Sequence, residues 1–77
     1  MSEVYLIALT ADARQATDPV DLAVALPDRL GSHQVEVIER GYKGRSVTVS
    51  MPRDLIKRVQ LEMPFVTIEP VSDMSLL

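Results

Sequence analysis

The sequence predicts an α+β domain in which a four-stranded antiparallel sheet carries two helices on one face. Short apolar or alternating segments, typical of strands, occur at residues 4–9, 34–40, 45–50 and 65–69. Segments with helical spacing separate the first strand from the second and the third from the fourth. A chain of 77 residues is long enough for one small domain, so we expect residues 1–77 to form it, with 71–77 as a C-terminal tail.

The first half is expected to contain one strand, one loop and one helix. Residues 4–9 (VYLIAL) are continuously apolar and predict a buried strand, and the polar residues 10–17 predict a loop. Asp18 as a capping residue and Pro19 at the first helical position predict a helix start, and Gly31 is a natural stop. The apolar face of this helix is expected to comprise Val20, Ala23 and Val24, with Leu22 and Leu26 beside it.

Pro27 leaves two endings open for that helix. Proline removes a backbone hydrogen bond and disfavours helical geometry at the residue before it. The helix therefore ends near Leu26, or it bends there and makes a last turn through Leu30.

A hairpin is predicted in the middle of the chain. Residues 34–40 and 45–50 both alternate, and the glycines of GYKG at 41–44 suit the connection. Alternation places Val47 and Val49 on the buried face and directs Ser46, Thr48 and Ser50 to the other.

The second helix is expected to open at Ser50–Met51–Pro52. Serine is the better capping residue, whereas proline at the first helical position would make Met51 the cap. Pro64 ends the helix, residues 65–69 form the last strand, and Pro70 closes that strand. The apolar face of this helix comprises Leu55, Ile56, Val59 and Met63.

The predicted order is strand, helix, strand, strand, helix, strand. Two units of this kind give a four-stranded antiparallel sheet with both helices on one face. Right-handed crossovers then select the ferredoxin-like βαββαβ arrangement over its mirror image.

Composition excludes several classes of protein. The chain has no cysteine, which excludes disulfides and thiolate metal sites, and its net charge is −3. No apolar run approaches the roughly 20 residues of a membrane span, and the start lacks the basic residues of a secretory signal. We therefore expect a small acidic cytoplasmic protein that has no membrane partner. The basic residues between Arg40 and Arg58 are expected to form a solvated face rather than a binding patch.

The residues that could perform chemistry are few. His33 is the single histidine, so neither a histidine metal site nor a Ser–His–Asp set is expected. The segment GYKG joins two strands and lacks the pattern of a phosphate loop. RNA-binding versions of this fold stack bases on strand aromatics, and here the central strands offer only Tyr5, so nucleic acid is not an expected partner. The sequence therefore indicates a non-enzymatic binding module without catalytic residues, metal or cofactor.

The second half of the chain resembles the inhibitor I9 family. This family comprises the propeptides of subtilisin-like serine proteases and free-standing intracellular inhibitors of such proteases. The resemblance rests on the order GYKGRSVTVSMPRDLIKRV…MPFVTIEPV. Its parts are a glycine–aromatic turn at Gly41 and Tyr42, the strand at 46–50, the helix at 55–59, the strand residues Val66, Ile68 and Glu69, and Asp73 beyond them.

The resemblance implies a protein partner, a subtilisin-like serine protease. Family members lay their sheet against two parallel helices of the protease, and acidic residues near the last strand cap the positive ends of those helices. Glu69 and Asp73 would take that role here. The tail would enter the active-site cleft as an added strand with Leu77 in the specificity pocket. The implied partner-binding residues are Glu69, Ser72, Asp73, Met74, Ser75, Leu76 and Leu77.

Two other interpretations stay open. The chain could be a structural or assembly subunit that binds a protein partner, or forms a homodimer, through the edge or the exposed face of its sheet. It could also bind nucleic acid through the basic residues between Arg40 and Arg58. The apolar tail residues Met74, Leu76 and Leu77 are compatible with packing on their own domain, with a partner, or with self-association.

Overall fold

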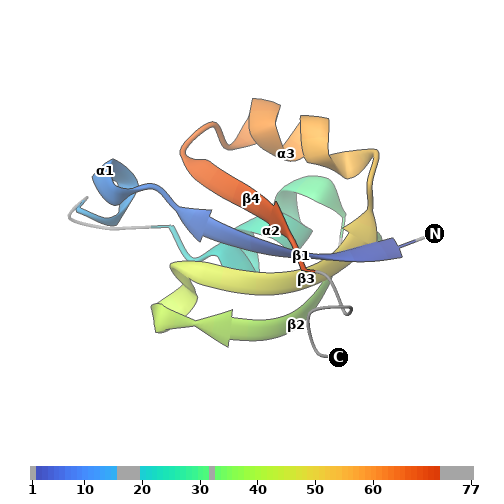
Figure 1. Cartoon of the computed structure of the whole chain (residues 1–77), viewed down its shortest axis with the longest axis horizontal. Helices are drawn as coiled ribbons and strands as arrows, with labels where there is room; N and C mark the ends of the chain where they lie inside the picture. The colour runs from blue at the N-terminus through green and yellow to red at the C-terminus, as the bar shows by residue number, and fades with distance from the viewer. Residues whose placement is uncertain (1, 16–19, 32, 72–77) are drawn as a thin grey trace.

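The computed structural model describes residues 2–15, 20–31 and 33–71. Within them the chain forms an α+β structure with an open four-stranded antiparallel sheet and three α-helices (Figure 1). The elements are β1 (Ser2–Leu9), α1 (Ala11–Arg14), α2 (Leu22–Leu30), β2 (Glu36–Gly41), the 3-10 turn η1 (Tyr42–Gly44), β3 (Ser46–Pro52), α3 (Leu55–Glu62) and β4 (Val66–Pro70).

The strands lie in the order β2-β3-β1-β4, so β1 and β3 are central and β2 and β4 are the edges. Each neighbouring pair is antiparallel. The pairing of β2 with β3 is interrupted by a bulge between Val37 and Glu39. A bulge twists an edge strand and makes it a poorer template for another chain.

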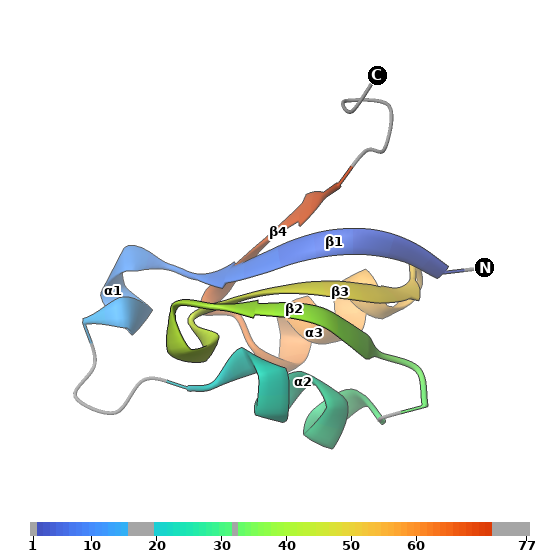
Figure 2. The same ribbon diagram turned by 90° about the horizontal axis from the view of Figure 1, so that it is seen from below.

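Helices α2 and α3 cover one face of the sheet, which is the lower side in Figure 2. Alternate residues of the central strands point toward these helices and are buried. None of the helices in the described ranges lies over the opposite face. The buried core consists of Tyr5, Ile7, Leu9, Leu22, Leu26, Leu30, Val35, Val47, Val49, Met51, Leu55, Val59 and Met63.

The hairpin forms as the alternation predicts, with strand limits that differ by one or two residues. Val47 and Val49 are at most 1% exposed, whereas Thr48 between them is half-buried on the other face. The turn depends on Lys43 and Gly44, which have φ values of 60° and 86°. Glycine adopts such angles without strain, and a lysine does so at modest cost.

Helix α2 begins later than the sequence indicates. Asp21 is its capping residue, and its side chain accepts a hydrogen bond from the Ala23 N–H at 3.1 Å. The predicted start at Asp18 and Pro19 lies outside the described residues. The expected apolar face is wrong at Val24, which is 65% exposed, whereas Val20 and Ala23 pack against the core as predicted. The buried residues of the helix are Leu22, Leu26 and Leu30. These leucines are four residues apart, so they follow one ridge of the helix.

Helix α2 continues through Pro27 to Leu30, which decides between the two endings that the sequence left open. Proline inside a helix costs about 3 kcal/mol. Leu22, Leu26 and Leu30 are at most 3% exposed, and burial of each leucine contributes roughly 1.5–3 kcal/mol. The leucines on both sides of Pro27 therefore hold the helix together on the core.

The segment expected to be a loop contains a short helix, α1. Thr10 caps it, with its hydroxyl accepting from the Ala13 N–H at 3.4 Å. The single turn begins directly after β1 and extends beyond the end of the sheet (Figure 1).

The predicted opening of the second helix is wrong by about three residues. Met51 and Pro52 are the last residues of β3, and α3 begins at Leu55 with Asp54 as its N-terminal flanking residue. Met51 is fully buried and pairs with Glu3 of β1. Pro52 sits beyond the point where β2 stops pairing with β3, so its missing N–H removes no ladder hydrogen bond. The predicted apolar face is confirmed, since Leu55, Val59 and Met63 are buried and Ile56 packs against them.

Candidate functional site

The sheet face that the described helices leave uncovered is a candidate binding surface, and we call it the open face. Strand register decides which side chains belong to it, because residues paired across strands point to the same side. Its centre is mixed apolar and hydroxyl-bearing, and its edges are acidic. The open face comprises Val4, Leu6 and Ala8 of β1, Ser46, Thr48 and Ser50 of β3, Glu36 and Glu39 of β2, and Thr67 and Glu69 of β4.

A shallow depression of about 330 Å³ lies on the open face. Its floor crosses the three strands β1, β3 and β2, and one arginine reaches it from α1. The lining residues are Leu6, Ala8, Arg14, Glu39, Gly41, Ser46, Val47 and Thr48. Sequence alternation indicated the outward hydroxyls of Ser46 and Thr48, but Arg14 was not a candidate because its segment was interpreted as a loop.

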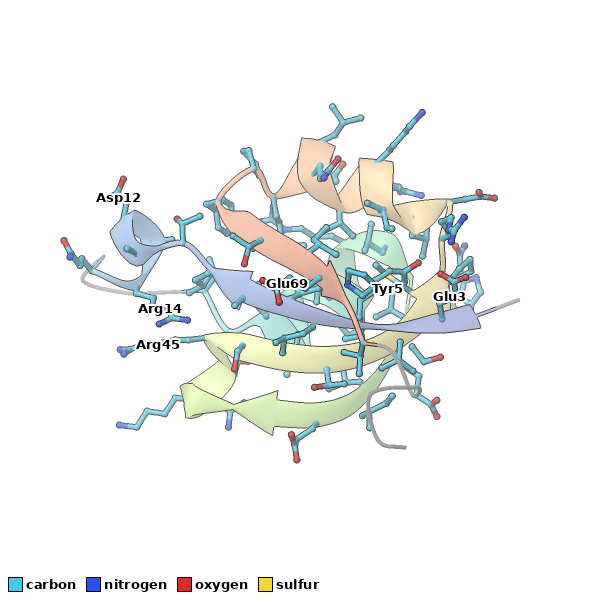
Figure 3. All side chains as sticks on the ribbon, in the orientation of Figure 1. Glu3, Tyr5, Asp12, Arg14, Arg45 and Glu69 are labelled. Carbon is cyan, nitrogen blue, oxygen red and sulfur yellow. The ribbon has the colours of Figure 1, made fainter. Side chains whose placement is uncertain are left out.

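Glu69 lies on the open face of the edge strand β4. It is exposed and pairs with Leu6 of β1. Figure 3 shows its side chain over the sheet, beside β1. The other implied partner-binding residues, Ser72 to Leu77, lie outside the described residues.

The last described residue continues the β4 pairing. Val71 donates its backbone N–H to the Val4 carbonyl at 2.9 Å, and the Thr10 N–H donates to the Phe65 carbonyl at 3.0 Å. Odd-numbered residues of β4 therefore bond to β1, so the N–H and C=O groups of Val66 and Ile68 point away from the sheet. These groups form an unpaired strand edge that leads to the position where the tail begins.

One ion pair ties helix α2 to the edge strand β2. The Arg40 Nη2 lies 2.9 Å from the Asp21 Oδ2, and its Nε also donates to the same carboxylate. These hydrogen bonds from Arg40 lower the pKa of Asp21, and the capping bond from Ala23 acts in the same direction. Gly44 packs so closely on Asp21 that a Cβ at this position would overlap its carboxylate.

Tyr5 is only 2% exposed and points toward the helices, so it does not offer a stacking surface on the open face. Its hydroxyl donates to the Glu3 Oε2 at 2.6 Å, and the Arg53 Nε lies 3.6 Å from the same oxygen. The hydrogen bond from Tyr5 lowers the pKa of Glu3 and raises that of Tyr5 itself. Figure 3 shows Tyr5 and Glu3 at the end of the sheet where β1 begins.

The basic residues between Arg40 and Arg58 do not form one patch. Arg40, Lys43 and Arg45 lie around the β2–β3 connection, whereas Arg53 follows the other end of β3. The seven residues of β3 separate the two groups by roughly 23 Å. Arg45 of the first group lies at the same end of the sheet as Arg14 (Figure 3).

The remaining candidates for chemistry are isolated. His33 is exposed in the turn before β2. In the part of the chain that the structure describes, no three His, Cys, Asp or Glu side chains come together in a way that could hold a metal ion. No helix in the described ranges is long and apolar enough to cross a membrane.

Comparisons with protein-family models, with curated proteins and with solved structures found no match for this chain.

Proposed function

We propose that this chain is a non-enzymatic, cytoplasmic binding module that inhibits or chaperones a subtilisin-like serine protease. The open face docks on the protease surface, and the segment that follows β4 enters the substrate cleft as an added strand. One observation carries the proposal: the described helices leave one sheet face uncovered, and the edge strand β4 runs along that sheet as far as Val71, where the tail begins.

The same proposal includes a ferredoxin-like arrangement. The strand order β2-β3-β1-β4 supports it, since each of the two crossovers, β1 to β2 and β3 to β4, passes through a helix on the same face. This arrangement leaves one face of the sheet available for a partner and places β4 at an edge.

The small side chains at the centre of the open face support docking on helices. Ala8, Ser46 and Thr48 line the depression with small side chains, so the ridge of a partner helix could approach the sheet closely. Glu69 adds an exposed carboxylate at the edge of this floor, and a carboxylate is favourable at a helix N-terminus.

Inhibition of subtilisin tests the proposal directly. The full chain is compared with a chain that lacks Asp73–Leu77 and with a Glu69→Lys variant. We expect inhibition by the full chain at micromolar concentration, loss of inhibition on truncation, and about tenfold weaker inhibition for Glu69→Lys, because repulsion replaces attraction at the helix ends.

Glu62→Lys is the matched control, since Glu62 is an exposed carboxylate on α3, in the helix layer. It is expected to inhibit as well as the native chain. Absence of inhibition by the full chain would refute the proposal, and equal inhibition by the truncated chain would refute the role of the tail.

Self-association through the sheet is the second candidate, that of an assembly subunit. Apolar side chains are exposed on the open face and at the sheet edges, namely Leu6 at 38%, Ile38 at 54% and Val71 at 42%. Sedimentation velocity across a range of concentrations is the test. A stable dimer at tens of micromolar would favour this function, and a monomer throughout would refute it.

A further inference from the structure

We infer that the depression on the open face is a subsite for one carboxylate side chain of an acidic protein partner, with Arg14 as its principal cationic group. The inference rests on the proposed function in one respect, namely that the open face is the docking surface. It adds that this surface binds a carboxylate at the depression, a position for which the I9 resemblance implies no contact.

The fold brings an arginine to a floor that carries hydroxyl groups. Arg14 is the last residue of α1, which begins directly after β1 and places its guanidinium at the depression. Ser46 and Thr48 contribute hydroxyls from the central strand β3. A guanidinium and two hydroxyl donors suit the oxygens of a carboxylate.

Gly41 keeps one of these hydroxyls accessible. A Cβ at this position would lie 2.9 Å from the Ser46 Oγ. Any other residue at position 41 would therefore cover the hydroxyl or displace it. The absence of a side chain here opens the β2 side of the depression.

Two arginines at this end of the sheet, Arg14 and Arg45, take no part in the ion pairs of the described residues. Those pairs join Arg40 to Asp21 and Arg53 to Glu3. Arg14 and Arg45 belong to neither pair, and Figure 3 shows both at the end of the sheet where β1 ends and β3 begins. A chain with net charge −3 thus presents a local positive region beside an uncovered face.

Glu39 limits what the subsite can bind. Its carboxylate lines the depression together with Arg14, so it repels an incoming anion and reduces the local positive charge. One carboxylate, rather than a multiply charged phosphate, fits this balance. The apolar side chains of Leu6 and Ala8 suit the methylene groups of a glutamate or aspartate side chain.

The test is an amide chemical-shift titration of the full, isotope-labelled chain by NMR. The probe is the peptide acetyl-Ala-Glu-Ala-Ala-amide, and its glutamine counterpart is the matched control ligand. We expect saturable shifts at the amides of Ala8, Gly41, Ser46 and Thr48 with the glutamate peptide at millimolar concentration, and no saturation with the glutamine peptide.

Charge variants test which side chains govern binding of the peptide carboxylate. Since exposed ion pairs are weak, Arg14→Gln is expected to weaken binding about threefold, and Arg14→Gln with Arg45→Gln about tenfold. Glu39→Gln is expected to strengthen binding about twofold because a repulsive charge is removed. Lys57→Gln, an exposed change on α3, should leave the affinity unchanged. The amide spectrum of each variant shows whether it is folded.

The subsite would be overturned by an equal response to the glutamine peptide, by shifts centred on α3 instead of the depression, or by an affinity that is unchanged in the double arginine variant. Tighter saturation by inorganic phosphate would also overturn it, by showing a general anion site. The peptide titration uses no protease, so its outcome is independent of the inhibition assay. If the chain inhibits subtilisin but does not bind the peptide, only the proposed subsite is refuted. If it binds the peptide but does not inhibit subtilisin, only the proposed protease function is refuted.

Discussion

Asp21 connects three parts of the chain through one carboxylate. It caps α2 at the Ala23 N–H, pairs with Arg40 of β2, and packs against Gly44 at the end of the hairpin turn. The cap is a local interaction that contributes about 1 kcal/mol. The pair with Arg40 spans 19 residues, so the same side chain fixes how the helix lies against the edge strand.

The pH dependence of stability should report the ion pair. The pKa of Asp21 is lowered in the folded chain, so its charged form stabilises the fold fully above the ordinary value of 3.8, and this contribution is lost as the pH falls through the folded pKa. Asp21→Asn keeps a capping side chain and removes the charge. We expect the native chain to exceed Asp21→Asn in free energy of unfolding by a constant amount between pH 5 and 8, and by less below about pH 4.

Urea unfolding followed by circular dichroism measures this difference. In an Arg40→Gln background the dependence on pH should become smaller, because the first cause of the lowered pKa is then absent. A difference that stays constant from pH 8 to pH 2.5 would contradict the assignment.

At the scale of elements, α2 shows how burial overrides local propensity. Its nine residues contain Pro27, yet the helix reaches Leu30 and ends at Gly31 with a φ of 98°. The Gly31 N–H donates to the Pro27 carbonyl at 2.9 Å, so the residue that disturbs the helix also accepts the hydrogen bond that closes it.

Replacement of Pro27 should stabilise the chain. Pro27→Ala restores an N–H inside the helix and removes the clash of the ring with the preceding turn. Proline also restricts the unfolded chain. The loss of that restriction offsets roughly 0.4–1 kcal/mol of the stabilisation gained in the helix. We expect a net increase of about 2 kcal/mol in the free energy of unfolding, measured in urea.

Pro64→Ala is the control, because Pro64 follows α3 and is exposed. It should lower the free energy of unfolding by less than about 1 kcal/mol, through the unfolded chain alone. A destabilising effect of Pro27→Ala would show that the ring of Pro27 contributes packing that exceeds its helical cost.

At the scale of the whole molecule, two layers enclose one core, and no helix of the described residues covers the second face of the sheet. Helices α2 and α3 lie on the same side (Figure 2), and the central strands send alternate side chains to the opposite side. Antiparallel sheets tolerate solvent on one face. The proposed protease docking and the alternative self-association would therefore use the same surface, and a single substitution tests both.

Thr48→Lys places a charge at the centre of the open face. Thr48 pairs with Leu6 on one side and Glu39 on the other, and it is half-buried. The long lysine side chain blocks the close approach of a partner, and its ammonium group loses water when a partner covers it, so we expect inhibition, or dimerisation, to weaken by at least about tenfold. Thermal unfolding should change by only a few degrees, because the lysine points to solvent in the isolated chain.

Gln60→Lys introduces the same charge on the exposed side of α3 and should affect neither property. If the Thr48→Lys variant inhibits as strongly as the native chain, the open face is not the docking surface.

Much of the fold is predictable from pattern, and the exceptions have physical causes. Alternation at 45–50 predicted which side of β3 is buried, and helical spacing predicted the face of α3, because both are local periodicities. The start of α3 was misplaced at Pro52, since proline rules describe a helix in isolation, whereas β3 extends to Pro52 through pairing with β1. Of the candidate site, Glu69 and the outward hydroxyls followed from the sequence, but the place of Arg14 beside them did not.

The sequence by itself determined the class of fold, the order of the strands and main helices along the chain, and the identity of most buried residues. These properties depend on local periodicity, on glycine and proline, and on a composition without cysteine. Only the tertiary structure decided that α2 passes through Pro27, that Tyr5 faces the helices, and that Arg14 meets Ser46 at one depression. Each of these features depends on contacts between residues that are distant in sequence. A local sequence pattern does not contain that information.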